Sequence, residues 1–121
     1  MALQLSYEDG NLAVVRASDT ITRTETDEIK RQIVRFIRRY GRIQVLIIIE
    51  ENFANLDMLA SWDDDQDDEF IQQHVNRLAI LGDIKFRDRA VLFFLKGFLP
   101  FSIEFFKSGH EEFARAWLTH P

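Results

Sequence analysis

A continuous apolar stretch, Ile43–Ile49, constrains the fold of this chain more than any other feature of its sequence. Five of its seven residues are β-branched, and Gln44 is the only polar one. β-branched residues favour strands, and an unbroken apolar run of this length is typical of a strand covered on both faces. Gly41 precedes the run and Glu50 follows it, so both ends are bounded. The stretch therefore predicts the central strand of a sheet that carries packed helices.

The length and composition predict one soluble domain over residues 1–121. The chain has no cysteine, which excludes disulfides and thiolate metal sites. No signal-like segment and no apolar run long enough to span a bilayer is found, so we expect a cytoplasmic protein without an integral membrane segment. A net charge of −5 argues against nucleic acid as the main partner, because phosphate binding needs a positive field.

The N-terminal part of the chain predicts a hairpin followed by a helix. Leu3–Tyr7 alternates apolar and polar residues, and Leu12–Ala17 follows a turn that contains glycine. A helix is expected from about Thr26 to Tyr40, ending at Gly41 as a C-cap. Its apolar stripe consists of Ile29, Ile33, Phe36, Ile37 and Tyr40.

A ridge of arginines lies on the opposite side of that predicted helix. Arginine is favoured near a helix C-terminus, so the preferred interpretation is a solvated face. The alternative is a ridge that receives an acidic partner. The ridge consists of Arg31, Arg35, Arg38, Arg39 and Arg42.

The C-terminal half predicts two more helices and two more strands. Helical spacing begins at Phe70 and passes through Ile71, His74, Val75 and Leu78, with Gly82 as the stop. Strands are expected at Arg89–Leu95, beside the central strand, and at Ile103–Phe106. A last helix is expected at Glu111–Leu118, with Phe113, Ala116 and Trp117 on its apolar side. The predicted fold is α/β, a mixed five-stranded sheet with helices packed on it, in the order β-β-α-β-α-β-β-α.

Tests of catalytic and metal-binding patterns give no site. Asp63, Asp65 and Asp67 have the first spacings of a calcium loop, but Asp68 stands where glycine is needed and His74 where a glutamate belongs. The acidic run Asp63–Glu69 is therefore interpreted as the charged start of a helix. No zinc-protease pair, phosphate loop or nucleophile–base pair is found. We expect no enzyme activity, no catalytic residue, no cofactor and no metal.

Five residues are the candidates for ligand or partner binding. His74 lies on an apolar helix face, where it is either a pH-responsive group or an edge-of-core residue bonded to carbonyls or water. Phe98 and Phe101 lie in a turn that contains proline, where apolar side chains need something to cover them. Phe53 and Trp62 complete an apolar pocket in the alternative in which the chain binds a ligand.

Three parts of the chain together resemble the SpoIIAA-like family, whose fold is related to STAS and CRAL-TRIO (Sec14-like) domains. They are the hairpin with a helix ending at Tyr40-Gly41, the strand Val45–Ile49, and the helix Glu112–Leu118. Arg89–Leu92 also looks like the family's Arg-x-Ala-Val strand start, and Pro100-Phe101 resembles the segment before its last strand.

The chain departs from the family pattern in two places. STAS anti-sigma-factor antagonists carry a phosphorylatable serine after the central strand, whereas Glu50–Ala60 contains no serine or threonine. The family's helix between its last two strands has only Lys96–Phe101 available, so we expect that helix to be absent or reduced to a turn.

The resemblance implies a non-catalytic regulatory or protein-interaction module. We expect a homodimer that covers the Phe98–Phe101 turn. The alternative is a carrier or sensor of an apolar or lipid-like ligand in a CRAL-TRIO-like pocket.

Overall fold

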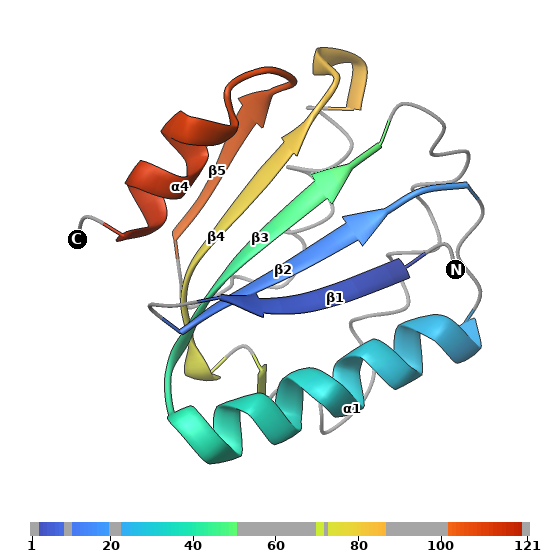
Figure 1. Cartoon of the computed structure of the whole chain (residues 1–121), viewed down its shortest axis with the longest axis vertical. Helices are drawn as coiled ribbons and strands as arrows, with labels where there is room; N and C mark the ends of the chain where they lie inside the picture. Colours follow the sequence, from blue (N-terminus) through green and yellow to red (C-terminus); the bar gives the residue numbers. More distant parts are fainter. Residues whose placement is uncertain are drawn as a thin grey trace.

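The computed structural model describes residues 3–8, 11–19, 23–50, 70–71, 73–86 and 102–119 (Figure 1). Its elements, in chain order, are β1 (Leu3–Glu8), β2 (Leu12–Ala17), α1 (Arg23–Tyr40), β3 (Ile43–Ile49), β4 (Val75–Gly82), the 3-10 helix η2 (Ile84–Phe86), β5 (Ser102–Lys107) and α4 (Glu111–Thr119).

The five strands form one mixed sheet whose spatial order, β1-β2-β3-β4-β5, is also the order of the chain. β1 pairs with β2 antiparallel, and every later pair is parallel. β3 lies in the middle between β2 and β4, so the prediction of a central strand is confirmed. The predicted class, α/β with a mixed five-stranded sheet, is confirmed as well.

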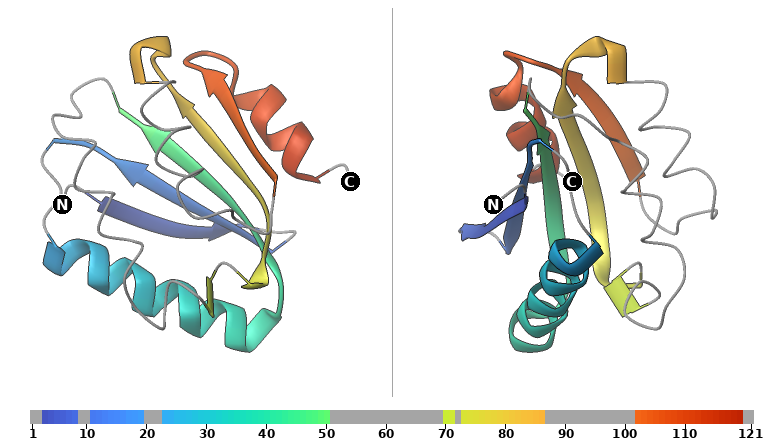
Figure 2. Two further views of the ribbon diagram at one scale, coloured as in Figure 1. Left: turned by 180° about the vertical axis from the view of Figure 1, so that it is seen from behind. Right: turned by 90° about the vertical axis from the view of Figure 1, so that its right-hand side faces the viewer.

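Helices α1 and α4 cover opposite faces of this sheet (Figure 2). Alternate residues of a strand point to opposite faces, so one buried strand can serve two cores. In β3, Val45, Ile47 and Ile49 join the core under α1, while Leu46 and Ile48 join the core under α4. One lateral row of paired residues under α1 crosses all five strands: Leu5, Val15, Ile47, Ile80 and Phe105.

The helix predicted through Leu78 to a stop at Gly82 is wrong in its second half. Helical residues end at His74, and Val75–Gly82 is strand β4. Four successive side chains, from Leu78 to Leu81, are buried, because β4 is covered on both faces like β3. Apolar residues at helical spacing led to the wrong period, while this short continuous run is the pattern of a buried strand.

Correcting β4 changes two further expectations. The neighbours of β3 are β2 and β4, so the strand beside the centre is Val75–Gly82. Residues 89–95, which were expected there, lie outside the described residues. Residues 83–101 separate β4 from β5, so the short stretch Lys96–Phe101 is not the whole connection between the last two strands.

The C-terminus of α1 is tied to the β1–β2 turn. Gly41 has φ +85°, and its N–H donates to the Ile37 carbonyl at 2.7 Å, so the predicted C-cap is present. Asn11, with φ +58°, places its Nδ2 within 3.5 Å of the Tyr40 carbonyl oxygen and 3.4 Å of the Arg42 carbonyl oxygen. The turn of the hairpin therefore holds the end of the helix.

Helix α4 faces the sheet with a different side from the predicted one. Ala114 and Leu118, four residues apart, are buried, whereas Phe113 is 64% exposed and Ala116 is exposed. Trp117 is half-buried and lies against Phe106, with ring centroids 6.1 Å apart. Of the predicted apolar side, only Trp117 contacts the core. None of the described helices is long and apolar enough to cross a membrane.

Candidate functional site

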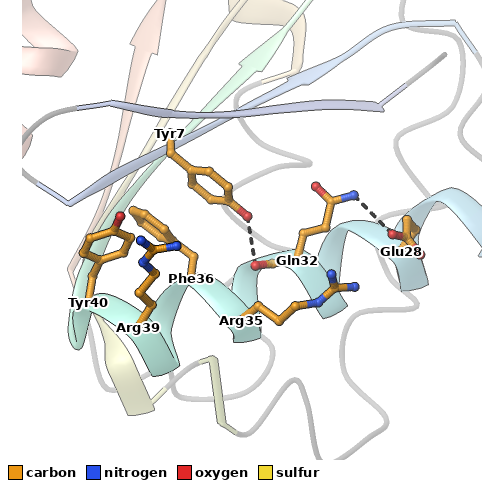
Figure 3. Close-up of a pocket in the computed structure, with 7 residues that line it drawn as sticks. All are labelled: Tyr7, Glu28, Gln32, Arg35, Phe36, Arg39 and Tyr40. Carbon is orange, nitrogen blue, oxygen red and sulfur yellow. Dashed lines mark hydrogen bonds between the residues drawn. The ribbon is translucent and has the colours of Figure 1, made fainter.

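A groove of about 380 Å³ lies between β1 and α1. Tyr7 enters it from β1, and six residues of α1 supply the rest of the lining (Figure 3). This volume lies at the lower end of the roughly 300–1,000 Å³ that small-molecule pockets span, and it can also hold one or two side chains of a binding partner. The lining consists of Tyr7, Glu28, Gln32, Arg35, Phe36, Arg39 and Tyr40.

Aromatic rings form one wall of the groove. Tyr7 and Phe36 are stacked, with centroids 4.0 Å apart and planes at 17°. Tyr40 follows Phe36 by one helical turn, with centroids 4.8 Å apart. The Tyr7 hydroxyl donates to the backbone carbonyl of Gln32 at 2.8 Å, which fixes the ring against the helix. Tyr7 and Tyr40 remain 43% and 50% exposed, so the aromatic wall faces solvent.

Two guanidinium groups lie beside this wall. Arg35 and Arg39 are four residues apart on α1 and therefore on one side of the helix. The Cζ atom of Arg39 lies 5.4 Å from the centroid of the Tyr40 ring, a cation–π distance. Within the described part of the chain, neither arginine has a carboxylate at ion-pair distance. Among the described residues, the groove thus presents positive charge without an ion-paired carboxylate next to aromatic surface.

Glu28, at the far end of the groove, is already engaged. It accepts a hydrogen bond from Arg31 at 2.8 Å and another from Gln32 at 3.2 Å. These bonds, the one from Arg31 first, lower the pKa of Glu28 from its ordinary value. The carboxylate of Glu28 is thus hydrogen-bonded to Arg31 and Gln32, and the charge of Arg35 makes a smaller contribution to the same shift.

The local environment also changes the acidity of Tyr7. Partial burial raises the pKa of the Tyr7 phenol, and the positive charge of Arg35 opposes that shift. At neutral pH the phenol is protonated, so it acts as a hydrogen-bond donor and an uncharged ring. A neutral aromatic wall with two cations is an arrangement for binding, not for proton transfer.

A second depression, of about 560 Å³, lies where the end of β1 meets α4. Its one cation, Arg115, is saturated: it donates to both carboxylate oxygens of Glu8, at 2.7 and 3.2 Å, and to Glu111 at 2.8 Å. These two carboxylates raise the pKa of Arg115. Since its charge is satisfied internally, this depression is a weaker candidate than the groove.

His74 contacts Phe70, which lies four residues earlier in the chain. Its ring is half-buried, and its Nδ1 donates to the Phe70 carbonyl at 2.8 Å, one helical turn back. The Phe70 and His74 rings lie 4.4 Å apart. A carbonyl partner is what the edge-of-core interpretation of His74 expects, and a role in binding stays a prediction. The other four candidates, Phe53, Trp62, Phe98 and Phe101, lie outside the described residues.

No metal site is seen in the regions that the structure describes: there, His, Asp and Glu side chains do not gather in groups of three or more. The groove itself is not predicted by the sequence. Its arginines belong to the ridge that is preferably a solvated face and alternatively a surface for an acidic partner, and Phe36 and Tyr40 belong to the apolar stripe. Tyr40 gives a further signal, because it is an aromatic residue at the border between that stripe and the arginines. Tyr7 could not be linked to them, because its contact with Phe36 spans two separate elements.

The architecture defines a small α/β domain with a hairpin-initiated, otherwise parallel sheet and helices on both faces. A comparison with family models matches residues 12–119 to the family described as SpoIIAA-like, and the chain belongs to that family. The match starts at β2, so Tyr7 and the rest of β1 precede the matched segment. No curated protein and no solved structure matched the chain.

Proposed function

We propose that this SpoIIAA-like chain is a non-catalytic regulatory or protein-interaction module. The observation that carries the proposal is the groove between β1 and α1, where two exposed tyrosine rings adjoin two arginines that have no ion-paired carboxylate among the described residues. Aromatic residues and arginine are the residue types that are enriched at protein interfaces. A reducing, cytoplasmic location, suggested by the cysteine-free sequence, is part of this proposal.

The packing of the sheet supports an interaction module over a carrier. Both described cores are filled with aliphatic side chains, from Val45, Ile47 and Ile80 on one face to Leu46 and Leu118 on the other. An apolar ligand needs an enclosed, largely apolar cavity. The groove is instead open to solvent at its tyrosines and contains charged groups.

Native mass spectrometry of the gently purified protein separates the two functions. For an interaction module we expect the mass of the polypeptide alone, as a monomer or a dimer. A stoichiometric apolar compound of a few hundred daltons, released on denaturation, would instead establish a carrier. For an interaction module, photo-crosslinking from position 40, which is part of the groove lining, should give one discrete protein adduct in cells. Position 76, on β4, is an exposed control.

The same spectra test the expected homodimer. We propose that Phe98 and Phe101 of one protomer are covered by the second protomer of a homodimer. Aromatic side chains each bury roughly 150–250 Å² when they are covered. Replacing both residues with serine should convert a dimer to a monomer without loss of helical circular dichroism. A double variant that stays dimeric would place the dimer contact elsewhere.

A further inference from the structure

The distance between Arg35 and Arg39 along the helix is close to the distance between alternate residues of an extended peptide. Residues four apart on a helix are separated by roughly 6 Å along its axis, at 1.5 Å per residue. Alternate residues of an extended segment are separated by roughly 6.6 Å and point to the same side. Two carboxylates at positions i and i+2 of a strand-like segment can therefore face Arg35 and Arg39 together.

The aromatic wall continues this line toward the end of the helix. Phe36 and Tyr40 lie beside Arg35 and Arg39 in the sequence, and Tyr7 stacks on Phe36 from the sheet (Figure 3). An apolar side chain of the same segment would lie on these rings. Aromatic pairs contribute to binding beyond the area that they bury.

Charge argues for a protein segment and against three other occupants. Nucleic acid needs an extended positive field, whereas the groove lining holds two arginines and one glutamate. A symmetric contact between two copies through this groove would place Arg35 and Arg39 of each copy opposite the same pair, with four like charges together. Glu28, at one end of the lining, disfavours a polyphosphate, which carries several negative charges.

Resting on the proposed function, we infer that the groove between β1 and α1 binds an acidic, extended segment of a partner protein. The segment carries two carboxylates on alternate residues and an aromatic or aliphatic side chain next to them. Arg35 and Arg39 bind the carboxylates, and the rings of Tyr7, Phe36 and Tyr40 receive the apolar side chain. Control by such a partner needs no phosphorylated serine after β3.

Three blocked hexapeptides test this inference by NMR titration of the full chain. The first has the sequence Glu-Ser-Glu-Ser-Phe-Ser, and the others replace both glutamates with glutamine or with lysine. We expect the acidic peptide to shift the resonances of Tyr7, Phe36 and Tyr40 and to bind at least about tenfold more tightly than the lysine peptide. Raising the salt concentration should weaken only the acidic peptide, because exposed charges are screened.

Variants of matched charge complete the test. Arg39→Glu should weaken the acidic peptide about tenfold or more and improve the lysine peptide. Arg42→Glu makes the same charge change at an exposed position outside the groove lining and should have much less effect. Circular dichroism shows whether each variant is folded. Tyr40→Ser should weaken binding of the acidic peptide but should not change the binding of a fourth peptide, Glu-Ser-Glu-Ser-Ser-Ser, in which serine replaces the phenylalanine.

Equal affinities for the acidic and lysine peptides would overturn the inference, as would equal effects of Arg39→Glu and Arg42→Glu. So would ATP that shifts the same resonances at lower concentration than the peptide, since the site would then take a nucleotide. A protein adduct formed from position 76 and not from position 40 would reject this inference, because the partner would then bind away from the groove. It would leave the proposed interaction module standing. A retained apolar compound would reject the proposed function itself.

Discussion

The two faces of the sheet are built from the same strands but are covered very differently. Helix α1, with 18 residues, lies over one face, and α4, with nine, lies over the other. The apolar cluster under α1 is the larger of the two, and one charged residue of α1, Lys30, is buried as well at 2% exposed, whereas Gln44 and Arg77 lie on the face of α4. Since alternate residues of each strand supply both faces, the difference comes from the helices. We therefore expect the face under α1 to contribute more of the stability, because its apolar cluster is larger.

The largest expected effect is that of a charge under α1. Ile47 is 3% exposed and lies in the middle of the lateral row that crosses the sheet. Ile47→Asp would bury an unpaired carboxylate, which costs at least several kcal/mol against a total stability of roughly 5–15 kcal/mol. We expect no cooperative thermal unfolding by circular dichroism.

Asn76→Asp provides the control for that experiment. Asn76 is exposed at the start of β4, so the same carboxylate there should change stability by less than about 0.5 kcal/mol. A folded Ile47→Asp with a melting transition near that of the parent would contradict the assignment of β3 as the doubly covered centre.

A pair of truncations in β4 compares the two faces directly. Ile80 is 0% exposed under α1, and the next residue, Leu81, is 5% exposed under α4. Large-to-small changes in a core cost about 2–5 kcal/mol, with the larger values where the surroundings cannot collapse. We expect Ile80→Ala to cost about 4 kcal/mol and Leu81→Ala about 2 kcal/mol in urea denaturation. The reverse order would show that the face under α4 is the stronger one.

A smaller effect, in the stabilising direction, is expected at Gln44. The Oε1 atom of Gln44 is buried on the face of α4, and none of the described residues donates a hydrogen bond to it. A buried, unsatisfied polar group costs about 1–3 kcal/mol, and methionine has a similar shape without that group. Gln44→Met should therefore raise the free energy of unfolding by about 1 kcal/mol. A loss of stability would mean that the Gln44 amide makes a bond that the methionine variant breaks.

The smallest effect concerns alkaline pH on the side of α1. Because partial burial raises the pKa of Tyr7 in the folded protein, the folded state holds this proton more tightly than the unfolded state. The contribution is thus fully present below about pH 10, the unfolded value, and is lost as pH rises through the folded pKa. Tyr7→Phe should remove this pH dependence and one step of the tyrosinate absorbance titration. If the titration of the parent shows no tyrosine above the ordinary range, the Tyr7–Phe36 stack is looser than described.

The sequence predicted those elements whose signal is local or continuous. Ile43–Ile49 has a single interpretation, because a run of β-branched residues fits no other element of that length. The hairpin, α1 and its glycine cap were likewise predicted from alternation, periodicity and turn residues. In α1, four of the five predicted stripe residues are buried, and Tyr40 turns out to be an exposed member of the groove.

The sequence-based predictions were wrong or incomplete where contacts with neighbouring elements determine the structure. In Val75–Gly82 the apolar residues fit both a helix and a buried strand, and the pairing with β3 and β5 selects the strand. The sequence suggests a helix stop at Gly82, but the structure gives this glycine a different role. An added Cβ there would lie 3.1 Å from the Cβ of Ile49, so the close packing of the two strands favours glycine. In α4 the sheet selects Ala114 and Leu118 over the larger Phe113. The groove depends on a contact between β1 and α1 that no local pattern encodes.

The identical order of strands in the chain and in the sheet has a consequence for synthesis on the ribosome. Each strand that leaves the tunnel can add to the edge formed by its predecessor, so no earlier strand has to separate to admit a later one. The hairpin of β1 and β2 forms first, from neighbouring residues, and every later strand must close a longer loop. Until β4 arrives, β3 presents an apolar open edge to other nascent chains. Until α4 is made, Leu46 and Ile48 lack the cover that its Ala114 and Leu118 provide, so the synthesis of α4 removes apolar surface that could cause aggregation.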